Sequence, residues 1–130
     1  MMTNGINHSN IQFHDSLLLS VEITGQDKIC LSLRTESGDP YRINLDGVRH
    51  FKCDGFREGN TVFEIEQVSS DDIKNEEMEA LLHLSKGKRT EEFTRLLIEV
   101  SDGTLMFLRI SASYGANVIS ISQNITISGP

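Results

Sequence analysis

Apolar and polar residues alternate through most of the chain, and this alternation is typical of half-buried β-strands. The alternating runs cover residues 17–24, 29–34, 41–45, 48–52, 62–68, 95–100, 105–110, 118–121 and 125–127. The pattern therefore predicts eight or nine short strands.

Turn-forming residues separate these runs. Residues 25–28 contain a glycine and join the first two runs, as in a β-hairpin. Asp102-Gly103 lies between two later runs and is the strongest hairpin signal in the chain. Gly47 interrupts the third strand and indicates a β-bulge there. Such close turns predict antiparallel pairing.

A helical pattern interrupts the strands near residues 71–85. Ser69 with Asp72 resembles a capping box, and Gly87 follows as a stop signal. One face is apolar and consists of Ile73, Met78, Ala80, Leu81 and Leu84. The opposite face consists of Asp72, Glu76, Glu79 and His83. This spacing predicts one amphipathic helix, with Glu77 inside the apolar stripe or at its rim.

Many strands and one helix predict an α+β, mostly β fold. We expect antiparallel sheets, arranged as a sandwich or as one strongly curved sheet, with the helix covering an open end. Residues 1–10 show no period and are expected to form a disordered tail, and residues 11–130 a single domain.

The charge balance bears on possible partners. The 130 residues include 12 basic and 19 acidic side chains, for a net charge of −7. Nucleic acids and anionic membranes bind clustered Lys and Arg, so neither is expected as a partner. A basic protein fits this charge, although many cytoplasmic proteins are mildly acidic without such a partner.

No targeting segment or cofactor motif is found. The N-terminus lacks the pattern of a signal peptide, and no apolar run reaches the length of a membrane helix. The expected location is cytoplasmic, with Cys30 and Cys53 reduced. No phosphate-binding or dinucleotide-binding glycine motif occurs, and no cofactor is predicted.

Phe13-His14-Asp15-Ser16 places four chemically distinct side chains at the start of the first predicted strand. His-Asp pairs bind metal in some phosphohydrolases, but there neighbouring helices complete the site. A structural role is the better interpretation. We expect Asp15 to accept backbone N–H bonds, His14 to bond a carbonyl, and Phe13 to fill the edge of the core.

Other candidate chemistry is weaker. His50 and Cys53 point to opposite faces of a strand and have no second ligand pair, so no metal site is predicted. The chain has no Gly-x-Ser-x-Gly motif, and no catalytic residue is predicted. A small hydrolase built around His14, Asp15 and Tyr114 is the least favoured alternative.

The acidic helix face is the candidate binding surface. It comprises Asp72, Glu76, Glu77, Glu79 and His83. The ordinary interpretation of such a stripe is the solvated face of an amphipathic helix. The alternative is a docking surface for a basic partner.

Several short segments resemble a family. They are Phe13-His14-Asp15-Ser16, Asn44-Leu45-Asp46-Gly47-Val48, Phe56 to Asn60, and Ile110 to Ala116. They are similar to small bacterial proteins with an N-terminal Phe-His-Asp-Ser/Ala motif, some of them immunity proteins of polymorphic toxin systems. The resemblance covers residues 13–68 and 105–127 and includes no counterpart of the acidic helix. It implies a structural role for Phe13, His14, Asp15, Ser16 and Tyr114, and no catalytic residues.

The favoured function is therefore a non-enzymatic protein-binding domain, of the immunity type, that neutralises a toxin by masking it. The alternative is a structural or regulatory module that self-associates through an exposed strand. Both a monomer and a homodimer are compatible with the sequence.

Overall fold

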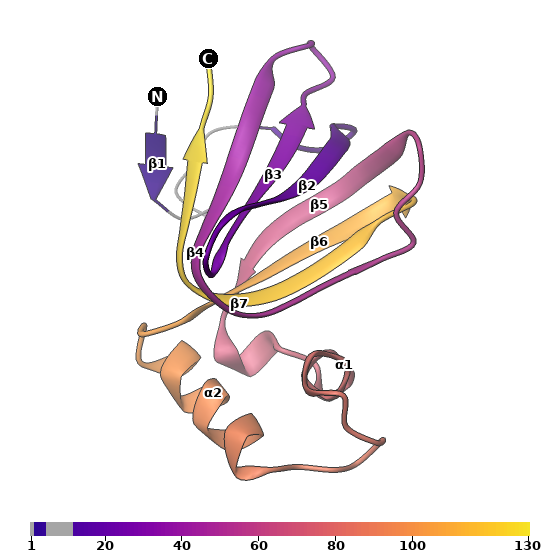
Figure 1. The fold of residues 1–130 in the computed structure, drawn as a ribbon. Coiled ribbons are helices and arrows are strands. Elements are labelled where there is room, and N and C mark those ends of the chain that lie inside the picture. Colours follow the sequence, from indigo (N-terminus) through magenta and orange to yellow (C-terminus); the bar gives the residue numbers. More distant parts are fainter. Residues whose placement is uncertain (1, 5–11) are drawn as a thin grey trace.

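Six long antiparallel strands and two α-helices form the described part of the protein, with a three-residue strand added at one edge (Figure 1). The computed structural model describes residues 2–4 and 12–130. The strands are β1 (Met2–Asn4), β2 (Leu17–Gly25), β3 (Lys28–Arg34), β4 (Pro40–Asp54), β5 (Asn60–Val68), β6 (Met106–Tyr114) and β7 (Asn117–Ser128). The 3₁₀ turn η1 (Ser70–Asp72) and the helices α1 (Asn75–Leu82) and α2 (Glu91–Ser101) lie between β5 and β6.

The strands form one sheet that closes on itself. Its order is β1-β7-β4-β3-β2-β5-β6, and β6 also pairs with β7. The ring is weakest between β2 and β5, where only Leu17 with Thr61 and Leu18 with Asn60 are paired. We call this junction the β2–β5 seam. Past it, β2 and β5 separate, and the sheet is a barrel with one open side.

The sheet bends along its two longest strands, β4 and β7. In β4, residues 40–46 pair with β3, whereas residues 48–54 pair only with β7. A bulge is present close to the expected position: Gly47 has a φ of 63°, but the register shifts after it, between Val48 and His50. A side chain on Gly47 would collide with Gln123 of β7. The bend therefore depends on a glycine at this position.

The sheet separates two hydrophobic clusters. The first fills the barrel and includes Leu31, Ile43 and Val118. The second lies between the outer face of β6 and β7 and the two helices, which cover that face (Figure 1), and includes Phe107 and Phe93. Full burial of side chains of this size contributes about 1.5–3 kcal/mol each.

The mostly β, antiparallel class is confirmed, but the number of strands is wrong. Residues 41–45 and 48–52 belong to one bent strand, β4, and residues 118–121 and 125–127 both belong to β7. Residues 95–100 are helical. The nine alternating runs therefore become six long strands in one curved sheet, not a sandwich of two.

The helical region also differs from the expectation of one helix. Residues 71–85 divide into η1 and α1, because Ile73 is extended. Ser69 does not cap a backbone N–H, and its hydroxyl donates to Asp72 at 3.0 Å instead. At the start of α1, the Lys74 N–H donates to the Glu77 carboxylate at 2.9 Å.

The second helix, α2, was predicted as a strand. Its first N–H groups are capped by Thr90, whose hydroxyl accepts from the Phe93 N–H at 3.2 Å. Asp102-Gly103 is not a hairpin turn. It ends α2, with Gly103 at a φ of 85° and the Leu105 N–H donating to the Glu99 carbonyl at 3.0 Å.

The predicted N-terminal tail lies largely outside the described residues. Residues 1 and 5–11 are not described, and Met2–Asn4 pairs with Ser128, Ile127 and Thr126 of β7 as strand β1.

Candidate functional site

The N-terminal motif forms the start of the β2–β5 seam. Phe13 is buried and packs edge-on against Tyr41, with 5.9 Å between ring centroids. Asp15 has a φ of 64°, and its N–H donates to the Val62 carbonyl at 2.9 Å. The Val62 N–H in turn donates to the Ser16 carbonyl at 2.8 Å. The backbone of the motif therefore holds β5 against the start of β2.

His14 reaches across to β5, as expected for a histidine that bonds a carbonyl. Its Nδ1 donates to the Phe63 carbonyl at 2.9 Å, and its ring meets the Phe63 ring edge-on at 5.5 Å. The bond to the Phe63 carbonyl, helped by the Asp15 carboxylate 3.5 Å away, raises the pKa of His14. The side chain remains more than half exposed.

Asn60 connects three segments at the seam, and sequence reasoning assigned it no role beyond its loop. Its Oδ1 accepts from the N–H groups of Arg57 at 2.7 Å and Ala116 at 3.1 Å. Its Nδ2 donates to the carbonyls of Leu18 and Arg57. Gly115 lies so close that a side chain there would collide with Asn60 Oδ1.

Three of the four segments quoted for the family resemblance lie at the seam, whereas Asn44–Val48 lies in β4, between β3 and β7. The N-terminal motif and the β6–β7 turn at residues 113–116 both bond the start of β5, which follows the loop that ends at Asn60. An asparagine after a glycine looks like an ordinary turn residue, so single-sequence reasoning offered no signal for this junction.

Exposed hydrophobic side chains gather around the seam. Among the described residues, seven large hydrophobic side chains are exposed. Six of them lie on β2, on β5, at the end of β6 or in the loop before β5, namely Leu17, Leu19, Ile23, Phe56, Phe63 and Tyr114. Only Ile98, on α2, is elsewhere.

The register places several of these side chains on one outer face. Leu17 of β2 pairs with Thr61 of β5, and Thr61 pairs with Tyr114 of β6, so the three lie in a row across the seam. The Arg57 guanidinium stacks over the Tyr114 ring, 5.9 Å from its centroid.

The edge of β2 continues from this row. β2 pairs with β3 along its length, but its other edge pairs with β5 only at Leu17 and Leu18. We call residues 19–25 the β2 edge. It carries Ile23, whose side chain is 80% exposed, and a single charged residue, Glu22.

The acidic helix face is not one continuous surface. Glu77 lies on the side of α1 that faces the sheet. Its carboxylate pairs with the Arg109 guanidinium of β6, at N–O distances of 2.7 and 2.6 Å. Glu79 accepts from the Gly87 N–H at 2.8 Å, and Asp72 accepts from Ser69. His83 ends α1 with a φ of 56°. Among these five candidates, Glu76 is exposed on α1 and makes no hydrogen bond or ion pair of this kind with another described residue.

The remaining sequence candidates are dispersed. His50 bonds Glu92 of α2 at 3.1 Å and does not join Cys53. Cys30 and Cys53 are free, and burial raises the pKa of both thiols. Within residues 2–4 and 12–130, no group of three or more His, Cys, Asp or Glu side chains is arranged to hold a metal ion.

No family model, curated protein or solved structure matches the chain. No helix in the described part of the chain is long and apolar enough to cross a membrane.

Proposed function

We propose that this protein is a protein-binding domain whose partner adds an extended segment to the β2 edge. The observation that carries the proposal is the set of exposed hydrophobic side chains on β2, on β5 and at the end of β6, beside a β2 edge that pairs with no described strand past Leu18. Contiguous exposed apolar surface is typical of protein-interaction sites. Unpaired strand edges bind extended segments through their main-chain hydrogen bonds.

The side chains at the seam support this function. Tyr114 is half exposed and stacked under Arg57. Tyrosine and arginine are enriched among the residues that contribute most to protein–protein affinity. Leu17 lies in the same row, so a segment on the β2 edge would also contact this apolar surface.

The charge of the protein favours a basic partner. The net charge is −7, and Glu22 is the charged residue of the β2 edge. Long-range attraction of this kind raises the association rate and weakens with salt. A narrower form of the proposal is an immunity-type role, in which the partner is a basic toxin domain encoded by an adjacent gene.

The test measures binding of that adjacent-gene domain by titration calorimetry. We expect salt-sensitive binding to the wild-type protein. Ile23→Lys places a charge on the β2 edge, where it opposes pairing without burying a charge, and should weaken binding at least about tenfold.

Ile98→Lys is the matched control, because Ile98 is also exposed, at 59%, and lies on α2. It should bind like the wild type. Equal affinity of the Ile23→Lys protein and the wild type would show that the β2 edge is not the binding site. Absence of wild-type binding would count against the immunity-type role.

The alternative function is self-association through the same edge. An edge with exposed Leu19 and Ile23 and one charge has little of the charged protection that keeps strand edges apart. In that case the molecular mass in solution is that of a dimer, and Ile23→Lys, but not Ile98→Lys, returns it to that of a monomer.

A further inference from the structure

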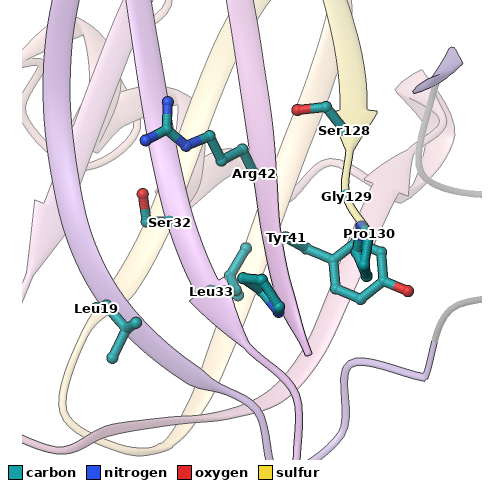
Figure 2. Close-up of a pocket in the computed structure, with 9 residues that line it drawn as sticks. Leu19, Ser32, Leu33, Tyr41, Arg42, Ser128, Gly129 and Pro130 are labelled. Atoms are coloured by element: carbon teal, nitrogen blue, oxygen red, sulfur yellow. The ribbon is translucent and has the colours of Figure 1, made fainter. Parts of the chain in front are cut away.

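A cavity on the outer face of the sheet shares one residue, Leu19, with the β2 edge and otherwise lies over β3, β4 and the end of β7. It has a volume of about 350 Å³ and extends from Leu19 across β3 and β4 to the end of β7 (Figure 2). This volume is at the lower end of the range for small-molecule sites, which is roughly 300–1,000 Å³.

Three polar side chains line one part of the cavity. Arg42 of β4 pairs in register with Ser32 of β3 on one side and with Ser128 of β7 on the other. Residues paired in this way point to the same face of a sheet, so Arg42 lies between two serines, and its guanidinium extends toward Ser32 (Figure 2). Figure 2 shows the three side chains on the same side of the sheet.

Among the described residues, no carboxylate pairs with the Arg42 guanidinium, whereas Lys52 on the same strand pairs with Asp54. Ser128 accepts a hydrogen bond from Asn44 at 3.3 Å, which leaves its own hydroxyl proton available. The polar part of the cavity therefore offers a positive charge and hydroxyl donors for an anion.

The rest of the cavity is apolar. On the face that carries Arg42, Leu19 and Pro40 line it, together with Pro130. The Tyr41 ring points to the other face, because Tyr41 alternates with Arg42 along β4, pairs with the core residue Leu33 and packs against Phe13. The apolar part of the cavity is therefore aliphatic.

We propose that this cavity binds a small organic carboxylate, with the carboxylate on Arg42 and its apolar part against Pro40 and Leu19. A planar carboxylate matches the forked guanidinium, and such charge-assisted bonds are about twice as strong as neutral ones. A phosphate ester is less suitable, because one arginine would face a dianion on a protein of net charge −7.

The test is an amide chemical-shift titration with phenylacetate, and with the neutral phenylacetamide as a matched ligand. We expect saturable shifts at Ser32, Arg42 and Ser128 with phenylacetate. Phenylacetamide should bind at least about tenfold more weakly, because it lacks the charge.

Two arginine variants locate the site. Arg42→Gln should weaken phenylacetate binding at least about tenfold, whereas Arg49→Gln removes the same charge from the same strand outside the cavity and should leave affinity unchanged. Equal binding of the two ligands, equal loss in both variants, or no saturable shift in the wild type would each overturn the proposal. The comparison of phenylacetate with phenylacetamide uses the wild type and so does not depend on whether Arg42→Gln folds. Ile23→Lys, on the β2 edge, should leave the affinity for phenylacetate unchanged.

Discussion

Asn60 shows how one side chain can hold a junction together. It is 2% exposed, and both ends of its amide are used: the oxygen accepts two backbone N–H groups and the nitrogen donates to two carbonyls. The four groups belong to β2, the loop after β4 and the β6–β7 turn. Buried polar groups of this kind stabilise a fold only while every bond is made.

Asn60→Asp tests this role. The carboxylate keeps both acceptor contacts but cannot donate, so it faces the carbonyls of Leu18 and Arg57 as a buried charge. We expect the free energy of unfolding to fall by about 2–4 kcal/mol, measured by urea denaturation.

Asn117→Asp is the control for that change. Asn117 is exposed, and its Oδ1 only accepts, from the Ala112 N–H at 2.9 Å, a bond that an aspartate retains. A loss in Asn60→Asp no larger than in Asn117→Asp would show that the Asn60 amide nitrogen contributes nothing to the junction.

Glu77 and Arg109 form the ion pair that fastens α1 to the sheet. The two side chains are 13% and 14% exposed, and Arg109 also donates to the Asp72 carbonyl at 3.0 Å. Burial alone would raise the pKa of Glu77, but the bonds from Arg109 and from the Lys74 N–H together hold the pKa below its ordinary value of 4.5. The charged form of Glu77 is therefore favoured by folding.

Glu77→Gln should lower the free energy of unfolding by about 2–4 kcal/mol near neutral pH, somewhat less than for a fully buried pair. The stabilisation from a lowered carboxyl pKa is complete above the unfolded value and is lost as pH falls through the folded value. The difference between wild type and variant should therefore shrink below about pH 4.5.

Urea denaturation across this pH range checks the prediction, with Glu76→Gln as the exposed control, expected to change stability by less than about 0.5 kcal/mol. Glu66 has a pKa raised by burial and by its neighbour Glu64, and the Glu77 charge adds a smaller contribution that only Glu77→Gln removes. A difference that stays constant from pH 7 to pH 3 would contradict the role of the Glu77 charge.

At the scale of elements, α2 shows where pattern reasoning failed. Leu96, Ile98 and Val100 alternate as in a strand, but Phe93, Leu96, Leu97 and Val100 also fit a helical stripe. The structure follows the second pattern and leaves Ile98 exposed. Thr90 before two glutamates was a capping signal that favoured the helix, and Asp-Gly fits a helix end as well as a hairpin.

The strands β2 and β3 were predictable because their pairing is local. They are adjacent in the chain and joined by a short turn, so alternation and turn chemistry define them. The β2–β5 contact joins residues more than forty positions apart, and nothing local in either strand indicates that they pair over two residues and then separate. The sequence pattern therefore indicated the acidic helix as the candidate binding surface and could not indicate the β2 edge.

At the scale of the whole molecule, the chain closes a six-strand ring and places its helices on one outer face (Figure 1). The helices therefore protect β6 and β7, whereas no helix of the described residues covers the β2–β5 seam, which β5 separates from β6 and near which most of the exposed hydrophobic side chains lie. The N-terminal motif lies at that seam, which gives it a structural position next to the proposed binding surface.

The most direct test of the β2 edge is amide hydrogen exchange, residue by residue, at several protein concentrations. If the edge is free for a partner, the outward-facing amides of residues 19–25 exchange fast in dilute protein, while the doubly paired amides of β3 exchange slowly. Addition of the binding partner then slows exchange in residues 19–25. Slow exchange of every amide in that segment at the lowest concentration would contradict the account, because the edge would already be covered within a single chain.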